Sequence, residues 1–339
     1  MTRHDVTLIP GDGIGPEITE QALKVLEATG IGFNWDHQVA GMASVESAGT
    51  PMPEATLESI RKNRLGLKGP LTTPVGDGFR SVNVALRKEF ELYANLRPAR
   101  TIMPGGRFSG VDLVIVRENV EGLYCGVEHF VPVAGDPRAV AESMAIVTRA
   151  GCDRIIRFAF EYAVARGRKK VTVVHKANIL KMVGGLFLEV GRDVARDYEG
   201  RVEWNDLIVD NTAMQMVIRP EQFDVVVTTN MFGDILSDLA SGLIGGLGLA
   251  PGGNIGTGAA IFEAVHGSAP DIAGQGIANP SALILASAMM LDYLGEIPAA
   301  DRIRTAVEDT IVTDGIRTRD LGGIATTAEF GSAVAARVG

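Results

Sequence analysis

The sequence predicts an α/β protein. At 339 residues the chain is long enough for two domains or for one large α/β body. Apolar, β-branched runs indicate buried strands, and 3.6-residue periodicity indicates helices between them. The predicted strands cover residues 6–10, 92–98, 111–119, 169–175 and 223–229, and the predicted helices include 17–29, 79–88 and 152–166. Alternation of this kind is typical of an α/β fold.

The composition excludes several classes of protein. A balance of 32 basic and 41 acidic side chains gives a net charge of −9, which argues against a nucleic-acid or anionic-membrane surface. Cys125 and Cys152 allow no disulfide framework and match no zinc motif, as expected in a reducing cytoplasm. The first residues lack the features of a signal peptide, and no apolar stretch is suited to span a bilayer. We therefore predict a soluble, cytoplasmic protein.

The first predicted strand leads into Gly11-Asp-Gly-Ile-Gly-Pro-Glu17, a tight turn that opens a helix. This stretch superficially resembles the dinucleotide-binding fingerprint. The third glycine of that fingerprint would fall at Pro16, so the glycines do not support a Rossmann fold. In the helix that follows, Ile18, Ala22 and Val25 share one face. The loop remains a candidate neighbour of a cofactor.

Two aspartates suggest a metal site. Asp234 and Asp238 lie four residues apart just after the strand at 223–229, so on a helix they share a face. Carboxylates at the end of a strand suit a hard cation such as Mg²⁺ or Mn²⁺. Asp210, at another strand end, offers a third carboxylate. The alternative is that Asp234 and Asp238 only oppose the dipole of a helix N-terminus.

Basic and hydroxyl groups gather in the first third of the chain. The loop 67–78 contains Lys68, Thr72 and Thr73, which suit a phosphate or carboxylate, although an ordinary surface loop is the alternative. The helix at 79–88 presents Ser81, Asn83 and Arg87. Arg97 lies at the predicted end of one strand and Arg117 at the end of another. Together with Arg87 they would suit a di- or tricarboxylic acid. The alternative is that these arginines pair with acidic residues for structural reasons.

Two further residues are candidate acid or base groups. Tyr124 follows Arg117 by seven residues and on its own would pass as a core or interface residue. Lys176 ends the strand at 169–175; it is either a solvated terminus or a base desolvated beside a metal. Residues 127–149 alternate like an interlocking arm, residues 243–253 make a plausible hinge, and residues 263–274 with 278–280 form a second loop rich in small residues.

Taken together, these motifs strongly resemble the β-decarboxylating dehydrogenases, the family of isocitrate, isopropylmalate, homoisocitrate and tartrate dehydrogenases. The match runs almost from end to end, through GDGIGPE, LKGPLTTP, RSVNVALR, LYANLRP, RENVEGLY, HKANI, NMFGDILSD, LIGGLGLAPGGNIG and EAVHGSAPDIAG. Several long motifs in one order are far more specific than any one of them.

The resemblance implies a fold that is not a Rossmann fold. A large α/β domain would comprise residues 1–95 and 248–339, and a smaller central α/β domain would comprise residues 96–247, with the active site in the cleft between them. The arm at about 127–149 would form a homodimer, and Lys176 and Asp210 would be lent to the neighbouring subunit's active site. Whether dimers assemble further stays open.

The resemblance also implies the chemistry. Asp234, Asp238 and the other subunit's Asp210 would bind Mg²⁺ or Mn²⁺, Lys176 would take the substrate's hydroxyl proton, and Tyr124 would protonate the enol left after CO₂ is lost. Arg87, Arg97 and Arg117 would bind the substrate. The cofactor would contact residues Ile14, Lys68, Thr72, Thr73, Asn178, Glu263, His266, Gly267, Ala269, Asp271, Ile272 and Asn279.

Two positions distinguish members of the family. Ser81 and Asn83 resemble isocitrate dehydrogenases, where these side chains meet the extra carboxylate; homoisocitrate, longer by one methylene, is the nearest alternative, and isopropylmalate or tartrate is less favoured. Asp271 with Ile272 predicts NAD, because an aspartate repels the 2′-phosphate of NADP. Ser81 also matches a serine that is phosphorylated in some bacterial relatives. The alternative from another functional class is a regulatory subunit, which would keep the fold but not catalyse the reaction.

Overall fold

The computed structural model describes residues 3–73, 79, 81–103 and 108–339. The contacts divide the chain into two compact units: unit 1 comprises Met1–Leu92, Arg97–Val111 and Ser241–Gly339, and unit 2 comprises Tyr93–Leu96 and Asp112–Ala240. Strand β4 (Ala94–Arg100) is shared between them. The family resemblance predicted boundaries at 95 and 248. The main difference is that 97–111 belong to unit 1, where Arg100 donates to Glu308 at 3.1 Å.

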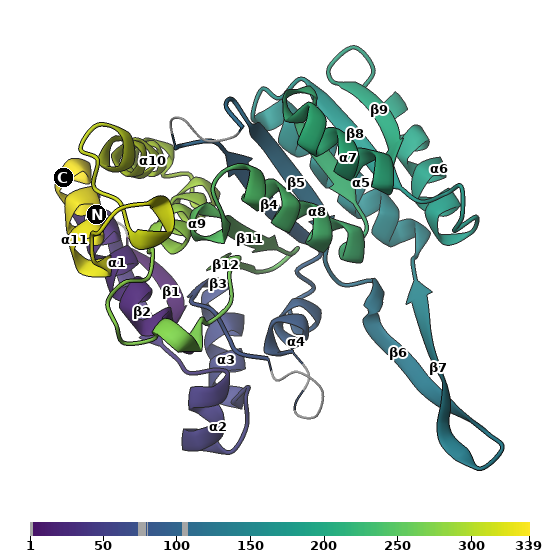
Figure 1. Cartoon of the computed structure of the whole chain (residues 1–339), viewed down its shortest axis with the longest axis horizontal. Helices are drawn as coiled ribbons and strands as arrows, with labels where there is room; N and C mark the ends of the chain where they lie inside the picture. Colours follow the sequence, from purple (N-terminus) through teal and green to yellow (C-terminus); the bar gives the residue numbers. More distant parts are fainter. Residues whose placement is uncertain (1–2, 74–78, 80, 104–107) are drawn as a thin grey trace. The chain divides into compact units, whose positions relative to one another are not determined.

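Unit 1 contains a largely parallel sheet with the strand order β2-β1-β3-β12-β11 (Figure 1). Only the β11–β12 pair is antiparallel. The strands are β1 (Arg3–Ile9), β2 (Gly32–His37), β3 (Leu65–Lys68), β11 (Pro251–Ile255) and β12 (Ala260–Ala264). The helices are α1 (Gly15–Ala28), α2 (Met42–Ala48), α3 (Glu54–Asn63), α4 (Val82–Glu89), α9 (Ser281–Tyr293), α10 (Ile297–Val312) and α11 (Thr327–Val338).

Helices cover this sheet because their apolar sides need burial. Helix α1 packs on α9 and α11, and α9 packs on β3, β11 and β12, whereas α3 packs on β1 and β3 (Figure 1). The predicted apolar face of α1 is confirmed, since Ile18, Ala22 and Val25 are fully buried. A separate core joins α3 and α4 to the sheet through Ile9, Ile60, Leu86 and neighbouring side chains, and so holds α4 in place.

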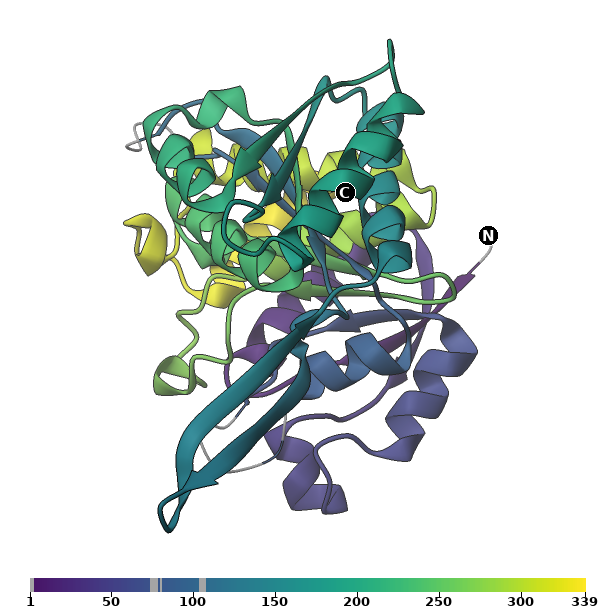
Figure 2. The ribbon, with the colours of Figure 1, turned by 90° about the vertical axis from the view of Figure 1, so that its right-hand side faces the viewer.

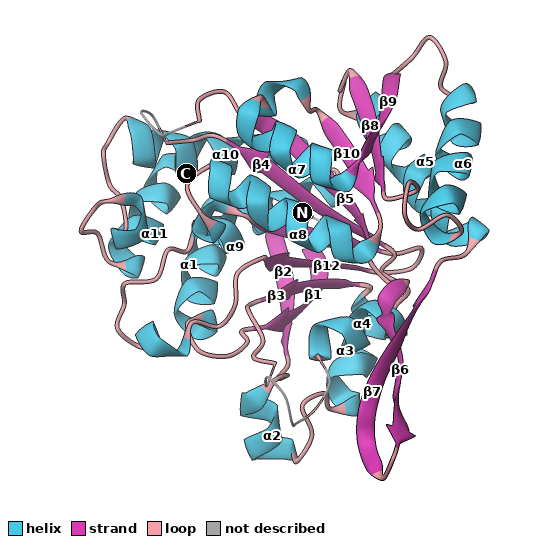
Figure 3. Ribbon diagram, turned by 45° about the vertical axis from the view of Figure 1, so that its right-hand side comes forward, coloured by secondary structure: helices cyan, strands magenta, loops and turns pink. Residues whose placement is uncertain are grey.

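Unit 2 contains the parallel strands β5-β10-β8-β9, again between helices (Figure 3). Helices α5 and α6 pack together on β8, and α7 contacts β8 and β9. The strands are β5 (Asp112–Glu118), β6 (Gly122–Val133), β7 (Asp136–Ile146), β8 (Lys170–His175), β9 (Glu203–Ile208) and β10 (Val225–Thr228). The helices are α5 (Arg149–Ala165), α6 (Val183–Arg196), α7 (Val209–Ile218) and α8 (Asn230–Leu243).

The predicted arm is an antiparallel hairpin of β6 and β7, which stands out as a long two-stranded ribbon in Figure 2. Its outer residues are solvent-exposed on both strands, and apolar side chains are among them: Phe130 is 47% exposed, Val133 51% and Met144 54%. An isolated two-stranded ribbon is only marginally stable in water. Exposed apolar side chains gathered on one element are typical of interaction surfaces.

Three predicted elements differ in the structure. Strand β4 does not end at Arg97 but continues to Arg100, because Asn95, Arg97 and Ala99 all keep the buried side of the alternation. The glycine-rich stretch at 243–253 ends as a strand: a 3₁₀ turn at Leu247–Leu249 leads into β11, which pairs with β12. Glu263, predicted in a loop, lies within β12.

Some predicted segments lie partly outside the described residues, namely 74–78 of the loop at 67–78 and residue 80 of the helix at 79–88. Among the described residues, no helix combines the length and the apolar character that crossing a membrane requires.

Candidate active site

The structure brings three predicted site residues of unit 2 together around one carboxylate. Arg117, near the carboxyl end of β5, donates from Nη1 to Oδ1 of Asp234 on α8. Tyr124, at the base of β6, donates its hydroxyl to Oδ2 of Asp234 at 2.6 Å, and the Arg117 guanidinium lies 5.1 Å from the Tyr124 ring centre. The Asp234 side chain keeps 38% of its surface exposed while Arg117 keeps 1%. The Asp234 carboxylate is thus fixed by two side chains and is still partly exposed to solvent.

The first turn of α8 explains this arrangement. Asn230 accepts hydrogen bonds from Nε and Nη2 of Arg117 at 3.1 and 2.7 Å, and donates to the carbonyl of Glu121 at 3.1 Å. A Cβ at Gly233 would lie 2.5 Å from Cγ of Arg117, so only glycine lets the helix approach the buried arginine. The Asn-Met-Phe-Gly-Asp sequence therefore fixes the guanidinium and directs it at Asp234.

Lys176 and Asp210 form a second predicted pair. Lys176 follows β8, Asp210 lies in the first turn of α7, and Nζ donates to Oδ1 at 2.5 Å. This hydrogen bond lowers the pKa of Asp210 from its usual value. Asp210 does not end a strand as predicted; β9 stops at Ile208, and the carboxylate lies two residues into the helix. Both residues face solvent in part, so they are accessible from outside the chain.

In unit 1 the predicted residues Lys68, Arg87 and Glu263 form a buried ionic cluster. Lys68 and Glu263 pair directly across β3 and β12 with Nζ and Oε2 2.7 Å apart. Arg87 on α4 reaches Oε1 of Glu263 at 3.4 Å and Oδ1 of Asn254 at 3.2 Å. Burial alone would raise the pKa of Glu263, but Lys68 and Arg87 outweigh it and hold that pKa well below its usual range.

Asp12 joins the loops that the sequence predicts near a cofactor. Its carboxylate accepts the backbone N–H groups of Met42 and Ala43, both at 3.1 Å, and that of Thr72 at 2.8 Å. Thr72 in turn shares a 2.7 Å hydrogen bond with the hydroxyl of Ser268, whose carbonyl accepts the N–H of Ile14 at 2.9 Å. Three loops distant in sequence are therefore held side by side.

His266 has an unsatisfied nitrogen in the same region. Burial lowers the pKa of its imidazole, which favours the neutral ring. In that ring the Nδ1 proton is directed at the carbonyl of Gly267, 2.9 Å away, and leaves Nε2 as an acceptor. Nε2 is buried and has no hydrogen-bond partner among the described residues, and neither has Oδ1 of Asn83. Two orphaned acceptors fit a donor group on a bound molecule, because buried polar atoms are normally paired.

The remaining predicted residues occupy varied positions. Ser81 is the N-cap of α4, where its hydroxyl accepts the N–H of Val84 at 3.5 Å, and Arg97 is buried in β4. Asp271 is exposed at the start of a 3₁₀ turn, Pro270–Ile272, and Asn279 is buried and donates to Asp320 at 2.9 Å. The other predicted cofactor residues of unit 1 lie in the same loops: Thr73, Gly267, Ala269 and Ile272. Asn178 belongs to unit 2.

The carboxylates of α8 are of the chemical type that binds a divalent metal ion. Asp234 and Asp238 are partly or fully exposed carboxylates one turn apart on α8, and hard oxygen ligands suit Mg²⁺ or Mn²⁺. Asp234 is bonded to Arg117 and Tyr124, and its side chain keeps 38% of its surface exposed. Within the described part of a single chain, no group of three His, Cys, Asp or Glu side chains could hold a metal.

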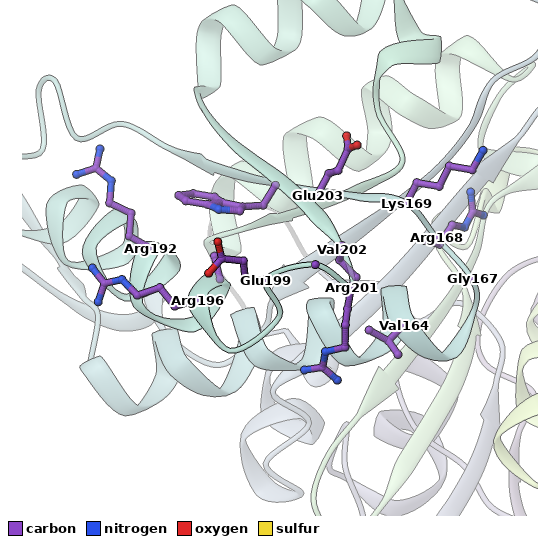
Figure 4. A pocket seen from close by; sticks show the side chains of 13 residues that line it. Val164, Gly167, Arg168, Lys169, Arg192, Arg196, Glu199, Arg201, Val202 and Glu203 are labelled. Atoms are coloured by element: carbon purple, nitrogen blue, oxygen red, sulfur yellow. The ribbon is translucent and has the colours of Figure 1, made fainter.

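A broad depression of about 1030 Å³ lies in unit 2, lined in part by Lys169, Arg192, Arg196 and Glu203 (Figure 4). None of the predicted site residues lines it. It opens beside the amino ends of β8 and β9, whereas Lys176 and Asp210 follow their carboxyl ends. One of its cations, Arg168, is already paired with Asp112 at 2.7 Å and Asp224 at 3.0 Å. The depression is therefore separate from the residues that the sequence predicts for the site.

Sequence reasoning missed three residues that hold these clusters: Asp12, Asn230 and Asn254. Asp12 lies in a motif interpreted only as a turn, and Asn230 begins the motif whose aspartates drew attention. Asn254 is a lone polar residue in a strand, where it donates to Glu263 at 2.8 Å. For Asp12 and Asn230 the available signal was a short polar side chain just after a predicted strand; no predicted strand adjoined Asn254.

Comparison with known proteins identifies the family. The family model described as isocitrate/isopropylmalate dehydrogenase matches residues 5–334. The chain belongs to this family. The crystal structure of isocitrate dehydrogenase from Methylococcus capsulatus superposes with a TM-score of 0.96, at 60% identity and with 99% of each chain covered. The α/β fold of the isocitrate dehydrogenase type, predicted from the resemblance, is thereby confirmed.

Curated relatives carry different names. The isocitrate/homoisocitrate dehydrogenase of Thermus thermophilus is 51% identical over 98% of this chain and 97% of its own length. A protein of Dictyostelium discoideum, named as a regulatory subunit of mitochondrial NAD isocitrate dehydrogenase, is 50% identical over 96% of this chain and 89% of its own length. Other relatives are named for NAD or for NADP. The family acts on isocitrate-type substrates with a pyridine nucleotide and a divalent metal, and dimers are typical of it.

Proposed function

We propose that the chain is an NAD-dependent isocitrate dehydrogenase that oxidises and decarboxylates isocitrate to 2-oxoglutarate and CO₂. The observation that carries the proposal is the Asp234 carboxylate, which is bonded to both Tyr124 and Arg117 yet open to solvent. A metal ligand, a proton donor and a carboxylate-binding arginine are thereby held within one hydrogen-bonded group.

Each residue has a role in this reaction. Asp234 and Asp238, with the partner subunit's Asp210, would hold Mg²⁺ or Mn²⁺; when bound, the cation acidifies the substrate hydroxyl and stabilises negative charge on that oxygen. The partner subunit's Lys176 would take the hydroxyl proton, and NAD, when bound, would supply the hydride acceptor. Tyr124 supplies a proton to the enol after CO₂ is lost.

Substrate choice is assigned to α4. Ser81 is the N-cap and Asn83 the second residue of this helix, and a serine hydroxyl and an asparagine side-chain N–H can each donate a hydrogen bond to a carboxylate. Polar groups here favour the third carboxylate of isocitrate over the alkyl group of isopropylmalate. Homoisocitrate is the second candidate: it is longer by one methylene, and the Thermus relative is named for both substrates.

NAD is assigned from Asp271. Its carboxylate is exposed at the start of the turn Pro270–Ile272. A carboxylate accepts hydrogen bonds from ribose hydroxyls and repels a 2′-phosphate. The unpaired Nε2 of His266, in the same region of the sequence, offers an acceptor to the cofactor.

The exposed apolar surface of unit 2 supports the proposal of a homodimer with shared active sites. Besides the β6–β7 hairpin, α7 and α8 expose Met214 at 50%, Ile218 at 60% and Ile235 at 58%. Such side chains on helices that carry metal ligands suit an interface with a second copy. This arrangement lets the partner supply Lys176 and Asp210.

A regulatory subunit is the alternative, since one relative bears that name. Subunits of that type lack parts of the catalytic set. Here Tyr124, Lys176, Asp210, Asp234 and Asp238 are all present. The site rather than the fold decides the function, and it favours catalysis.

The deciding experiment follows NADH formation by the purified protein with Mn²⁺ and, at matched concentrations, isocitrate, homoisocitrate or isopropylmalate. We expect the highest kcat/KM for isocitrate, abolition by EDTA with recovery on adding Mn²⁺, and little turnover with NADP. A higher kcat/KM for homoisocitrate would leave the mechanism standing and overturn the interpretation of α4. Absence of turnover with every substrate would favour the regulatory subunit.

A further inference from the structure

His175 links the two strands that lead into Lys176 and Asp210. It is the last residue of β8 and only 4% exposed. Its Nδ1 lies 3.0 Å from the backbone nitrogen of Ala177, and its Nε2 lies 3.2 Å from Oδ2 of Asp206 on β9. One imidazole therefore spans from the residue after Lys176 to the strand that leads into Asp210.

The contacts fix which nitrogen carries the proton. A backbone N–H can only donate, so Nδ1 must offer its lone pair to Ala177. In the neutral ring the proton is then on Nε2 and is donated to the Asp206 carboxylate. Both ring nitrogens are satisfied, and the buried ring has one orientation.

The backbone of Lys176 is held from a second side by α6. A Cβ at Gly184 would lie 2.9 Å from the carbonyl carbon of Lys176 and 2.9 Å from the nitrogen of Ala177. The peptide after Lys176 is thus packed between a glycine and an imidazole. Asp206 lies on β9, four residues before Asp210. Ile208, two residues after Asp206 on the same strand, is in register with His175 on β8.

We propose that His175 and Asp206 are positioning residues that hold Lys176 and Asp210 at hydrogen-bonding distance. The inference rests on the proposed function, because Lys176 is the proposed base. A small error in the placement of a reacting group can reduce a rate about 100-fold, which is why such a link affects kcat. Neither residue touches the reacting atoms.

Three variants separate the two halves of the link. In His175→Asn the side-chain oxygen replaces Nδ1 and still accepts from Ala177, but the side chain does not reach Asp206. In His175→Gln the amide nitrogen replaces Nε2 and reaches Asp206, but leaves the N–H of Ala177 unbound. His175→Ala removes both contacts. Arg192→Gln is the matched control, because Arg192 meets Asp206 only at 4.0 Å and is 56% exposed.

The measurements are kcat and KM of the intact enzyme with isocitrate, NAD and Mn²⁺, each normalised to folded protein, and hydrogen exchange of the Ala177 amide. We expect His175→Ala to lower kcat about 10- to 100-fold while KM for NAD stays within about twofold. His175→Asn should keep the Ala177 amide protected and recover only part of the loss, because it lacks the contact with Asp206. His175→Gln should also recover only part of the loss but leave the Ala177 amide unprotected, and Arg192→Gln should behave as wild type.

The proposal is overturned if wild type turns over isocitrate and His175→Ala, after normalisation to folded protein, keeps kcat within about twofold of it. It is also overturned if the Ala177 amide exchanges equally in wild type and His175→Ala. Hydrogen exchange of the Ala177 amide tests the role of His175 even if the wild type proves inactive. Such inactivity would by itself overturn only the proposed function.

Discussion

Lys68 and Glu263 are directly paired residues of neighbouring parallel strands, with Nζ and Oε2 2.7 Å apart and both side chains at most 7% exposed. Arg87 approaches the same carboxylate from α4. Two cations thus share one buried anion, so the folding stability of unit 1 depends on the Glu263 carboxylate. The cluster also ties α4, with its proposed substrate residues, to the sheet beside the proposed cofactor loops.

Glu263→Gln should therefore destabilise the protein strongly. Removing one partner of a buried ion pair leaves an uncompensated charge and typically costs about 3–5 kcal/mol of unfolding free energy. Urea unfolding at pH 7, followed by circular dichroism, measures the loss. Glu54→Gln is the control, because the Glu54 side chain is 65% exposed in its pair with Arg61 and should barely change the midpoint.

The unfolding free energy should depend on pH differently in wild type and in Glu263→Gln. The pKa of Glu263 is depressed in the folded state, so its contribution is present above the unfolded value of about 4.3 and is lost as the pH falls toward the folded value. Wild type should lose unfolding free energy steeply below about pH 4.3, and Glu263→Gln less steeply. Parallel slopes for the two proteins would contradict the assigned ionic state.

Ser81→Asp should abolish turnover of isocitrate without unfolding α4. Aspartate is as good an N-cap as serine, so the helix start keeps its partner for the N–H of Val84. The added negative charge repels a tricarboxylate. We expect an unchanged melting temperature and a loss of kcat/KM of at least about 100-fold, that is about 2.7 kcal/mol. Ser81→Thr, which caps without charge, is the control, and retained activity in Ser81→Asp would count against substrate contact.

Asp271→Lys with Ile272→Tyr should move the preference toward NADP. The double change replaces an exposed carboxylate by a cation and a hydroxyl, both of which suit a 2′-phosphate. The measurement is the ratio of kcat/KM for NAD to that for NADP at fixed isocitrate and Mn²⁺. The single variant Asp271→Asn serves as a control that removes repulsion without adding a cation. An unchanged ratio in the double variant would refute the assignment of NAD to this position.

Elements with a clear repeat were predictable. The strand and helix at the start of the chain, the strand before Lys176 and the strand before α8 are all where periodicity and β-branched runs place them. The family motifs grouped Lys176 with Asp210, and Tyr124 with Asp234, and in the structure each pair is in contact. No local pattern could show that these contacts form, because the partners lie far apart in sequence.

The failures have a physical pattern. Glycines at 252 and 253 indicated a loop, yet they lie in strand β11, because tertiary packing overrides local propensity. The predicted loop at 263–274 begins two residues late, since Glu263 and Ala264 end β12 and the residues after them are not in a strand. Asp12 and Asn230 were overlooked because a short polar side chain at a turn is interpreted as local. Their partners are backbone groups of other loops and a buried arginine, which only the folded chain brings near.

Mixing two inactive variants tests whether active sites are shared. Tyr124→Phe removes the proposed proton donor from a chain's own site, whereas Lys176→Ala removes the base that the chain lends to its partner. In a mixed dimer one site has both defects and the other has neither. Random pairing of equal amounts gives half mixed dimers, so about one quarter of the wild-type sites should be intact.

Co-expression of the two variants, with turnover compared to equal amounts of wild type, measures this recovery. Each variant alone is the control and should stay nearly inactive. If Tyr124 and Lys176 of one chain served the same site, every site in a mixed dimer would carry one defect and no activity would return. Exposed apolar side chains on the hairpin and on α7 and α8 favour the dimer that complementation needs. Recovery near one quarter would therefore establish both the dimer and the exchange of Lys176 between its subunits.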